Sequence, residues 1–328
     1  MIKVLQIGLG SMGKRRIRNL QYLGYMNIIG FDFRKDRLDE SKKLYNIETI
    51  SDLDKINLDD ITHIIISTPP DKHIDYALWA VKNNKHVFIE ASVVDDKYSE
   101  LIQISKKNNV VVAPSCTMRF DPLNKKVKEI LDSKVLGKNV FLQHHFGLYL
   151  PYWHPYEDIK DFYVSNKTTG AAREIVPFDM VYISWFIGLP ENNLSGLLTK
   201  TDILDTDIDD IYSLQYKTKD NCHVQFTIDV VSKQAYRTTR IICESGSIEL
   251  DTVKGTLSVY FAEEDNWKIY NRGQLSTTKS IEEMYVLEME TFMNALKGNA
   301  KWPYSIEEDW EVLKCLYSAE DSYYKSVK

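Results

Sequence analysis

A glycine-rich turn between two short apolar runs limits what this chain can fold into. The run from Ile2 to Ile7 leads directly into Gly8-Leu9-Gly10-Ser11-Met12-Gly13, which has the spacing G-x-G-x-x-G, and a basic helical pattern follows. A second apolar run then ends at Asp32, about 20 residues after the last glycine. Strand, glycine turn, helix, second strand and acid together form the fingerprint of a dinucleotide-binding βαβ unit. A chance glycine-rich turn is the alternative, and the order of the flanking elements argues against it.

Each residue of the turn has a physical role in this interpretation. Gly8 permits the tight turn from strand to helix, and Gly10 has no Cβ, so a pyrophosphate can approach the backbone. Gly13 lets the helix pack closely on the strand. Ser11 and Met12 open the helix, where free N–H groups and the helix dipole favour the negative pyrophosphate.

The acid at the end of the second run indicates which cofactor binds. Asp32 would accept hydrogen bonds from a ribose 2′-OH and would repel a 2′-phosphate, which favours NAD over NADP. Arg34 and Lys35 follow immediately and could bind that phosphate, so NADP stays possible.

Strands and helices alternate up to about residue 115, which predicts a parallel, doubly wound α/β sheet. The run His63–Ser67 is continuously apolar, as expected for a strand buried on both faces. Ligands of such sheets bind beyond the carboxyl ends of the strands. Further candidates at those ends are Thr68, Pro69, His73 and Glu90. We interpret His73 as supporting the loop beside the nicotinamide rather than reacting.

From Asn139 onward the pattern changes to alternating runs joined by polar turns, which predicts a largely antiparallel sheet. One helix, from about Asp179 to Phe186, interrupts these runs, and two helices close the chain. At 328 residues the chain is long for a single core. We therefore expect an N-terminal Rossmann domain over residues 1–119 and a second, α+β domain over residues 120–328. The last helix is expected to pack back onto one of them.

Composition excludes several classes of function. The net charge is −6 and no basic block occurs, which argues against a nucleic-acid partner. No apolar stretch reaches the length of about 18 residues that a membrane span needs. The four cysteines are scattered, which fits a reduced, cytoplasmic setting and predicts no metal site. The N-terminal residues enter a strand directly, so we expect no signal peptide.

Four motifs together resemble the glucose–fructose oxidoreductase / inositol dehydrogenase family, often called Gfo/Idh/MocA. They are the glycine turn through Lys14-Arg15, Ser67-Thr68-Pro69-Pro70 with His73, Met118-Arg119-Phe120-Asp121-Pro122, and Trp185-Phe186-Ile187-Gly188. The resemblance rests on their order and spacing, and it covers nearly the whole chain. The aromatic segment Tyr149–Pro155 also resembles members of nucleotide-sugar and surface-glycan pathways.

The resemblance implies reversible hydride transfer between NAD(P) and a secondary alcohol of a sugar, a nucleotide sugar or a cyclitol. It also implies a large open sheet that carries the active site and the interface of a homodimer or homotetramer. Such chemistry needs a base for the hydroxyl proton and an acid near the developing alkoxide. The family usually supplies a lysine from an E-K-P motif, and an Asp and a His spaced D-x-x-x-H.

This chain departs from that pattern at two positions. The E-K-P segment reads Glu90-Ala91-Ser92, so the lysine is absent. In the second motif Glu174 stands at the Asp and Phe178 at the His. Two of the three usual proton-handling groups are therefore missing, while the cofactor fingerprint is intact.

Other residues could handle the protons. Glu174 could be a base if burial raised its pKa, or it could be a surface or ion-paired glutamate. His154 is the second catalytic candidate, and a packed or solvated side chain is its alternative. It lies among Tyr149, Tyr152 and Trp153, which suit stacking on a sugar or a nucleobase.

Two arginines are candidates for binding the substrate. Arg119 and Arg173 could clamp a carboxylate or a diphosphate, because a guanidinium fork matches such groups. Arg119 could equally be a structural residue at the domain junction.

Three functions fit these observations. The first is an NAD(P)-dependent oxidoreductase acting on a sugar or nucleotide sugar, in surface-glycan or nonulosonic-type sugar biosynthesis. The second is a redox-neutral enzyme that holds NAD and catalyses elimination, hydrolysis or epimerisation. The third is a catalytically degenerate NAD(P)-binding scaffold, which the loss of lysine and histidine together would predict.

Overall fold

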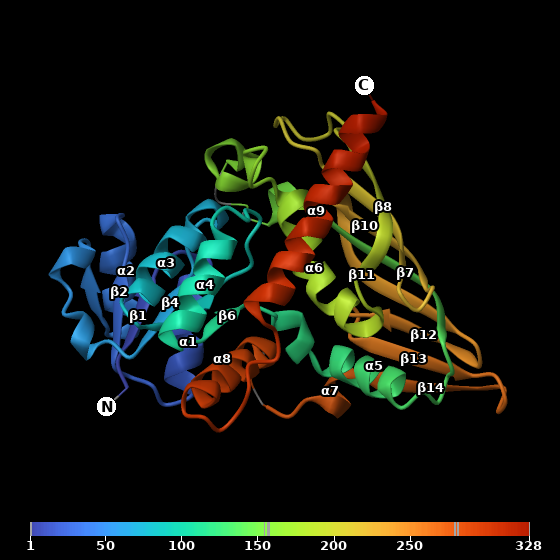
Figure 1. Ribbon diagram of the computed structural model, residues 1–328, viewed down its shortest axis with the longest axis horizontal. Helices are drawn as coiled ribbons and strands as arrows, with labels where there is room; N and C mark the ends of the chain where they lie inside the picture. Colours follow the sequence, from blue (N-terminus) through green and yellow to red (C-terminus); the bar gives the residue numbers. More distant parts are fainter. Residues whose placement is uncertain (1, 154, 156–157, 279, 281, 328) are drawn as a thin grey trace. The chain divides into compact units, whose positions relative to one another are not determined.

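The computed structural model describes residues 2–153, 155, 158–278, 280 and 282–327, and it contains two compact units (Figure 1). The first unit contains residues 1–117 and 280–310, and the second contains residues 118–279 and 311–328. The expected division into residues 1–119 and 120–328 omitted the return of residues 280–310 to the first unit. The last helix accordingly begins in the first unit and continues in the second.

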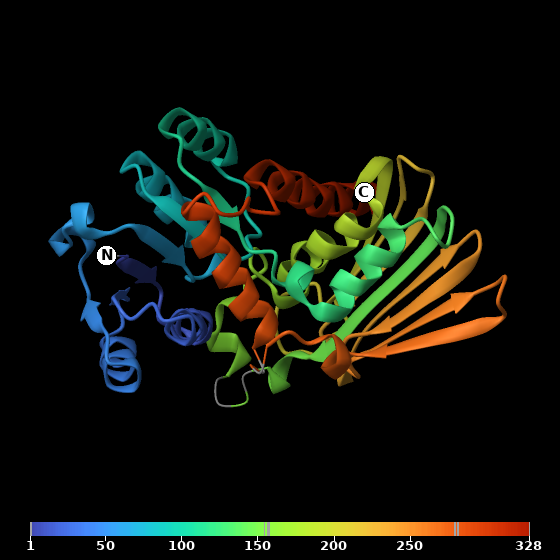
Figure 2. The same ribbon diagram turned by 90° about the horizontal axis from the view of Figure 1, so that it is seen from below.

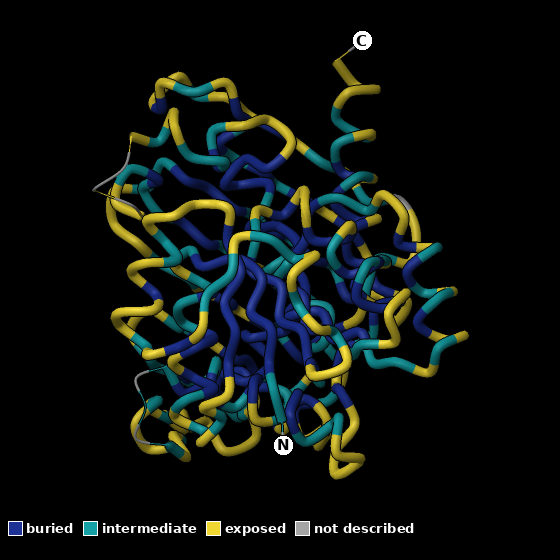
Figure 3. Tube along the Cα trace, turned by 90° about the vertical axis from the view of Figure 1, so that its left-hand side faces the viewer, coloured by how far each residue is buried: buried dark blue, intermediate teal, exposed yellow. Residues whose placement is uncertain are grey.

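The first unit is built on a six-stranded parallel sheet in the order β3-β2-β1-β4-β5-β6. The three central strands are buried along their whole length, as Figure 3 shows for the strands of this unit. This confirms the doubly wound sheet predicted from the continuous apolar runs. The strands are β1 (Val4–Ile7), β2 (Ile28–Phe31), β3 (Glu48–Ile50), β4 (His63–Ile66), β5 (His86–Ile89) and β6 (Val112–Pro114).

Helices connect these strands in the predicted order. They are α1 (Ser11–Tyr22), α2 (Lys35–Tyr45), α3 (His73–Lys82) and α4 (Tyr98–Asn108), with short 3-10 turns at Leu53–Lys55, Leu58–Asp60 and Pro70–Lys72. Helix α8 (Glu283–Leu296) packs against α1, and α9 (Ile306–Ser326) follows it.

A buried ion-pair network joins α1, β5 and α8. The guanidinium of Arg16 is fully buried and donates two hydrogen bonds, of 2.6 and 2.8 Å, to the carboxylate of Glu90. Its Nη1 lies 2.8 Å from Oε2 of Glu288, which is also fully buried. Glu288 accepts further hydrogen bonds from Ser115, Cys116 and Thr117. A buried charge needs such partners, so the network fixes α8 against the sheet.

The second unit contains an eight-stranded sheet in the order β14-β13-β12-β11-β7-β10-β9-β8. Neighbouring strands are antiparallel except β7 and β10, which run parallel. The largely antiparallel sheet is thus confirmed. The strands are β7 (Asn139–Tyr149), β8 (Pro190–Thr199), β9 (Ile211–Thr218), β10 (His223–Asp229), β11 (Val231–Cys243), β12 (Gly246–Asp251), β13 (Thr256–Phe261) and β14 (Asn266–Asn271).

Helices cover one face of this sheet, which we call the inner face. Figures 1 and 2 show α5 (Pro122–Asp132) and α6 (Ala171–Ile187) on that face, with the C-terminal part of α9. The short α7 (Arg272–Leu275) follows β14, and 3-10 turns lie at Thr117–Phe120, Leu150–Tyr152, Ile159–Asp161 and Tyr163–Ser165. No described helix covers the opposite, outer face.

Helix α6 is longer than the sequence predicted. It begins at Ala171 rather than near Asp179, and it contains Pro177 in its interior. Proline lacks the N–H that would bond to the carbonyl of Arg173, so the sequence pattern breaks there. Burial of the residues on both sides of Pro177 holds the helix together.

Candidate functional site

The glycine turn of the first unit has the geometry that anion binding requires. Gly8 has φ +86°, and a Cβ there would lie 2.4 Å from the carbonyl oxygen of Ser67. A Cβ on Gly13 would lie 1.9 Å from the carbonyl oxygen of Gly8, so this position accepts only glycine without backbone movement. Gly10 is the N-cap of α1, and no described side chain caps that helix. Its first N–H groups, from Ser11 and Met12 on, are thus open to a pyrophosphate.

Asp32 lies at the carboxyl end of β2 with its carboxylate held by backbone. Its Oδ2 accepts a 2.9 Å hydrogen bond from the N–H of Leu9, and its Oδ1 accepts one of 2.9 Å from the N–H of Arg34. The carboxylate therefore has a fixed orientation beside the glycine turn. Each oxygen has a second lone pair with which to accept a ribose hydroxyl.

Two arginines lie close to Asp32, and the sequence identified only one of them. The side chain of Arg34 makes a bidentate ion pair with Asp36, with N–O distances of 3.1 and 2.6 Å. The guanidinium of Arg37, which the sequence interpretation missed, lies 3.5 Å from Asp32 and 3.6 Å from the Cβ position of Gly10. A basic residue in the first turn of the helix after the acid was the available signal. Arg37 is therefore the better placed cation for a 2′-phosphate.

The buried His73 fixes the loop after β4. Its Nε2–H donates to the carbonyl of Thr68 at 2.8 Å, and its Nδ1 accepts from the hydroxyl of Ser92 at 3.1 Å. Burial lowers the pKa of His73, which favours this neutral form. The geometry fits the predicted supporting role, with Thr68 partly exposed and Pro69 exposed on the loop.

Glu90, predicted to contact the cofactor, has both carboxylate oxygens engaged. They accept the two hydrogen bonds from Arg16, and Oε1 also lies 3.2 Å from the hydroxyl of Ser67. The geometry favours a structural role for Glu90, and its contact with a cofactor stays a prediction.

In the second unit, Glu174 lies in the first turn of α6 and is partly exposed. The hydroxyl of Tyr163 donates a 3.2 Å hydrogen bond to its Oε1. Phe178 follows one helical turn later on the same stripe and is also partly exposed. A carboxylate and a phenol in contact can hold and pass a proton, so Glu174 stays a candidate catalytic residue and Tyr163 becomes its candidate partner.

Arg173 makes other contacts than the predicted clamp. Its Nε and Nη2 donate to the carboxylate of Glu320 at 2.6 and 3.2 Å, and its Nη1 donates to the carbonyl of Thr168 at 2.7 Å. The side chain is 8% exposed. These contacts favour a structural role for Arg173, and substrate binding by it stays a prediction.

Arg119 is similarly held. Its Nε donates to the carbonyl of Val181 at 3.0 Å, and its guanidinium lies 5.8 Å from the ring centre of Trp185. These contacts hold the segment that precedes α5 against α6. They favour the structural alternative for Arg119, and substrate binding by it stays a prediction.

Part of the aromatic segment lies at the surface of the protein. Tyr152 and Trp153 are exposed, at 64% and 38%, and the ring of Tyr149 meets that of Tyr152 edge to face at 4.8 Å. His154, the second catalytic candidate, lies outside the described residues. The exposed rings suit stacking on a sugar face, and their role stays a prediction.

A charged cluster on the inner face was not found from the sequence. Asp179 of α6 is fully buried and accepts a 2.9 Å hydrogen bond from Nε2–H of His144. Nε of Arg237 lies 3.1 Å from the same carboxylate oxygen. Burial lowers the pKa of His144, so Asp179 and Arg237 form the charged pair. The residues come from β7, α6 and β11, and no short motif joins them.

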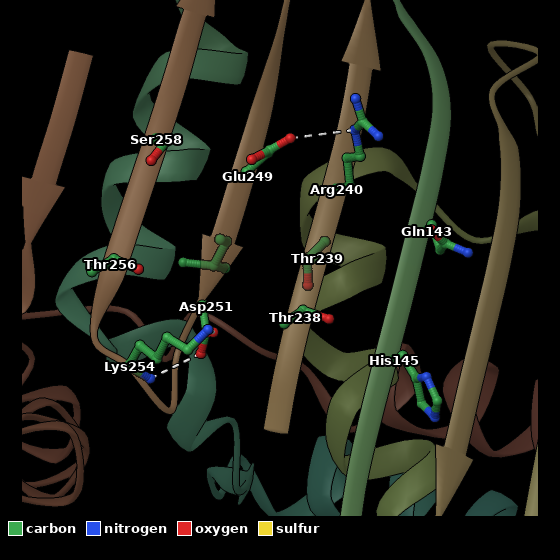
Figure 4. A pocket seen from close by; sticks show the side chains of 11 residues that line it. Gln143, His145, Thr238, Thr239, Arg240, Glu249, Asp251, Lys254, Thr256 and Ser258 are labelled. Atoms are coloured by element: carbon green, nitrogen blue, oxygen red, sulfur yellow. Dashed lines mark hydrogen bonds and ion pairs between the residues drawn. The ribbon is translucent and has the colours of Figure 1, made fainter. Parts of the chain in front are cut away.

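The outer face has a polar cluster of its own, since the neighbouring residues His144 and His145 point to opposite sides of the sheet. Nε2 of His145 and the hydroxyl of Tyr236 each lie 2.9 Å from Oδ2 of Asp229. A Cβ on Gly147 would lie 2.6 Å from the ring of Tyr236, so this glycine makes room for the cluster. His145 also lines a shallow groove of about 440 Å³ over β7, β11, β12 and β13 (Figure 4).

Among the described residues, no group of three or more His, Cys, Asp or Glu side chains could hold a metal ion. Within the same residues, no helix is long and apolar enough to cross a membrane.

Comparison with protein families gives two matches along the chain. A model described as an oxidoreductase family with an NAD-binding Rossmann fold matches residues 2–115. A model of the GFO/IDH/MocA C-terminal domain matches residues 124–249.

Most relatives match only part of this chain. An oxidoreductase, P35, of Formosa agariphila is 37% identical over 84 residues, which cover 25% of this chain and 26% of that protein. Myo-inositol 2-dehydrogenase of Thermotoga maritima is 28% identical over 137 residues, which cover 40% and 41%. Inositol 2-dehydrogenase of Rubrobacter xylanophilus is 24% identical over 317 residues, which cover 91% and 84%. Apart from this last one, the matched segments span less than half of these relatives' length.

Solved structures share the fold at low sequence identity. Levoglucosan dehydrogenase in complex with NADH gives a TM-score of 0.86 at 16% identity, covering 99% of this chain and 97% of that one. UDP-N-acetylglucosamine 3-dehydrogenase of Acidithiobacillus ferrooxidans gives 0.80 at 15% identity, covering 98% and 97%.

Proposed function

Because the chain belongs to the GFO/IDH/MocA oxidoreductase family, with its NAD-binding Rossmann domain, we propose that it transfers hydride between NAD and a sugar or nucleotide-linked sugar. The reacting group is a secondary alcohol or its ketone. The observation that carries the proposal is the intact cofactor geometry, in which Asp32 is fixed by two backbone N–H groups beside an uncapped α1.

The first unit supplies cofactor binding in this proposal. The N–H groups at the start of α1 hold the pyrophosphate, and the Asp32 carboxylate accepts the ribose hydroxyls. Bound NAD supplies the chemistry of accepting or releasing a hydride. His73 holds the loop of Thr68 and Pro69 in place through its two hydrogen bonds.

The second unit supplies the proton chemistry. When an alcohol is oxidised, Glu174 takes the hydroxyl proton, directly or through the hydroxyl of Tyr163. This replaces the family lysine, which is Ala91 here, and the family histidine, which is Phe178.

The substrate class follows from the exposed aromatic side chains. Tyr152 and Trp153 offer rings for stacking on a sugar or a nucleobase, which favours a nucleotide sugar of a surface-glycan or nonulosonic-type pathway. Work on such a substrate would place the protein in the cytoplasm. A homodimer or homotetramer through the outer sheet face completes the proposal.

The first experiment denatures freshly purified protein and identifies the released small molecules by mass spectrometry. NAD(H), alone or with a nucleotide sugar, is the expected result. A panel containing myo-inositol, levoglucosan and UDP-N-acetylglucosamine is then tested for NADH formation. On the substrate found, Glu174→Gln should lower kcat by roughly 100-fold or more at unchanged NADH affinity. The exposed Glu191→Gln is the matched control and should stay at the wild-type rate.

The same experiment separates the two alternatives. Product formation without net NADH change would indicate a redox-neutral enzyme. A scaffold is favoured by the absence of lysine and histidine at positions 91 and 178. Binding of NADH with no turnover on any sugar would support it. If neither NADH nor NADPH bound at millimolar concentration, the oxidoreductase proposal would be wrong.

A further inference from the structure

One cation of the second unit lies beside the position where the family histidine is missing. Arg237 of β11 pairs in register with Phe146 of β7, and both side chains are on the inner face. The guanidinium carbon lies 4.2 Å from the ring centre of Phe146 and 5.8 Å from that of Phe178. Phe178 is the residue at the histidine position. A permanent positive charge therefore lies against the ring that replaces the imidazole.

The guanidinium is held from one side. Its Nε lies 3.1 Å from the fully buried carboxylate of Asp179, and its Nη1 lies 3.6 Å from Sδ of Met118. Asp179 also accepts a hydrogen bond from His144, whose Nδ1 accepts one from the hydroxyl of Thr239 at 2.8 Å. Two aromatic rings and one carboxylate thus fix the plane of the guanidinium, which limits the rotamer entropy lost on binding.

One end of the guanidinium stays available. Nη2 of Arg237 makes no hydrogen bond to the described residues, and the side chain is 17% exposed. A guanidinium carries five N–H donors, of which Nη2 presents two. In a partly buried site such donors gain strength from the low dielectric, provided that an acceptor arrives. The geometry is that of a preformed donor site for a ligand oxygen.

We propose that Arg237 is a catalytic residue that donates from Nη2 to the reacting oxygen of the substrate, in place of the family histidine. This inference rests on the proposed function. In the oxidation of an alcohol, the hydride leaves the carbon for NAD⁺ and the hydroxyl proton passes to Glu174. The C–H and O–H bonds break and a C=O double bond forms. Arg237 keeps all its protons and stabilises the negative charge that develops on the oxygen.

The division of labour follows from the chemistry of the two groups. A guanidinium does not lose its proton in proteins, so it can stabilise charge but cannot act as the acid. Glu174 lies one helical turn before Phe178 on the same stripe of α6, and it provides the group that exchanges protons. The enzyme family normally combines both tasks in lysine and histidine. Here they are separated between an arginine and a glutamate.

Arg237→Met tests the proposal with the full chain and the substrate identified by the panel. Removing one preorganised donor should lower kcat roughly 100- to 1000-fold. The affinity for NADH should not change. The pKa values read from the pH–rate profile should not change, because a guanidinium keeps its proton in proteins. Arg240→Met is the matched control: it lies on the same strand, 58% exposed, and should keep the wild-type rate.

Arg237→Lys separates a catalytic from a purely structural role. A lysine can keep the ion pair with Asp179 but has no second, rigidly placed donor. We expect it to retain the wild-type Tm with less than about a tenth of kcat/KM. If Arg237→Met lowers Tm, combining it with Asp179→Asn removes the unpaired buried carboxylate, and the loss of kcat should persist.

Three outcomes would overturn the proposal. Wild-type kcat in Arg237→Met would exclude contact with the reacting oxygen. Full recovery of activity in Arg237→Lys would leave only a structural ion pair. A wild-type chain that oxidises no sugar of the panel would refute the proposed function, and the role of Arg237 would fall with it.

Discussion

Replacing Arg16 by methionine removes the cation on which two carboxylates of the first unit depend. Glu90 and Glu288 both face this guanidinium, and Glu288 is completely buried. The guanidinium also lies 4.6 Å from the ring centre of Phe88. Methionine preserves much of the volume and the ring contact, so the change isolates the charge. Burial already raises the pKa of Glu288, and the loss of Arg16 removes a group that lowers it.

The expected cost is large for a single substitution. Breaking a buried ion pair by removing one partner costs about 3–5 kcal/mol, because a buried charge is left uncompensated. Three hydrogen bonds from Ser115, Cys116 and Thr117 still reach Glu288 and offset part of this. We therefore expect Arg16→Met to lower the free energy of unfolding by about 3 kcal/mol, which corresponds to a fall in Tm of roughly 10 °C for a unit of this size.

Urea unfolding at several pH values measures the effect. In Arg16→Met the folded state holds a proton on Glu288 more tightly than the unfolded chain does. The variant should therefore lose stability as pH rises, and its deficit against wild type should shrink as pH falls. Lys14→Met, which removes the exposed ion pair with Glu40, is the control and should cost less than about 1 kcal/mol. An Arg16→Met variant no less stable than this control would refute the reasoning.

Three further predictions concern the first unit. Gly13→Ala places a Cβ 1.9 Å from a carbonyl oxygen, so NADH affinity measured by fluorescence titration should fall at least tenfold, whereas Gly273→Ala meets no atom within 4 Å and should be neutral. Asp32→Ser should weaken NADH binding and reduce the preference for NADH over NADPH, because the carboxylate beside Arg37 is removed. An unchanged ratio of the NADH and NADPH affinities would contradict this. Burial lowers the pKa of His63 to about 4. As pH falls, His63 therefore takes up a proton at a higher pH in the unfolded chain than in the folded protein. The free energy of unfolding of the wild type should then fall by about 3 kcal/mol between pH 7 and pH 4 through this residue. In urea titrations, His63→Phe should show a weaker dependence of the unfolding free energy on pH, and an equal dependence in both proteins would contradict the prediction.

Much of the fold could be predicted because its signals are local. Continuous apolar runs marked β1, β2, β4 and β5, and alternation marked most strands of the second sheet. Strand β14 was missed because five of its six residues are exposed, so it has no buried face. The start of α6 was missed because Pro177 interrupts the helical pattern. Packing, which the sequence pattern does not contain, decided both.

The arrangement around the glycine turn was predictable for the same reason. Residues 8–32 lie within one βαβ unit, so sequence spacing determines which groups meet at that turn. The substrate side was less predictable. Arg173, expected as a clamp, meets Glu320, which is 147 positions away in the chain. Arg237 was not a candidate at all, since nothing near it in the sequence marks a site.

The sequence by itself determined the Rossmann unit, its glycine turn, the acid predicted to favour NAD and the absence of the family lysine and histidine. Each depends on residues that are neighbours along the chain or on residue identity alone. Only the tertiary structure decided which charges meet: Arg16 with Glu90 and Glu288, and Arg237 with Asp179 beside Phe178. Coulomb and hydrogen-bond interactions act over a few ångströms in space, so chain positions that the fold brings together can pair whatever their separation in sequence.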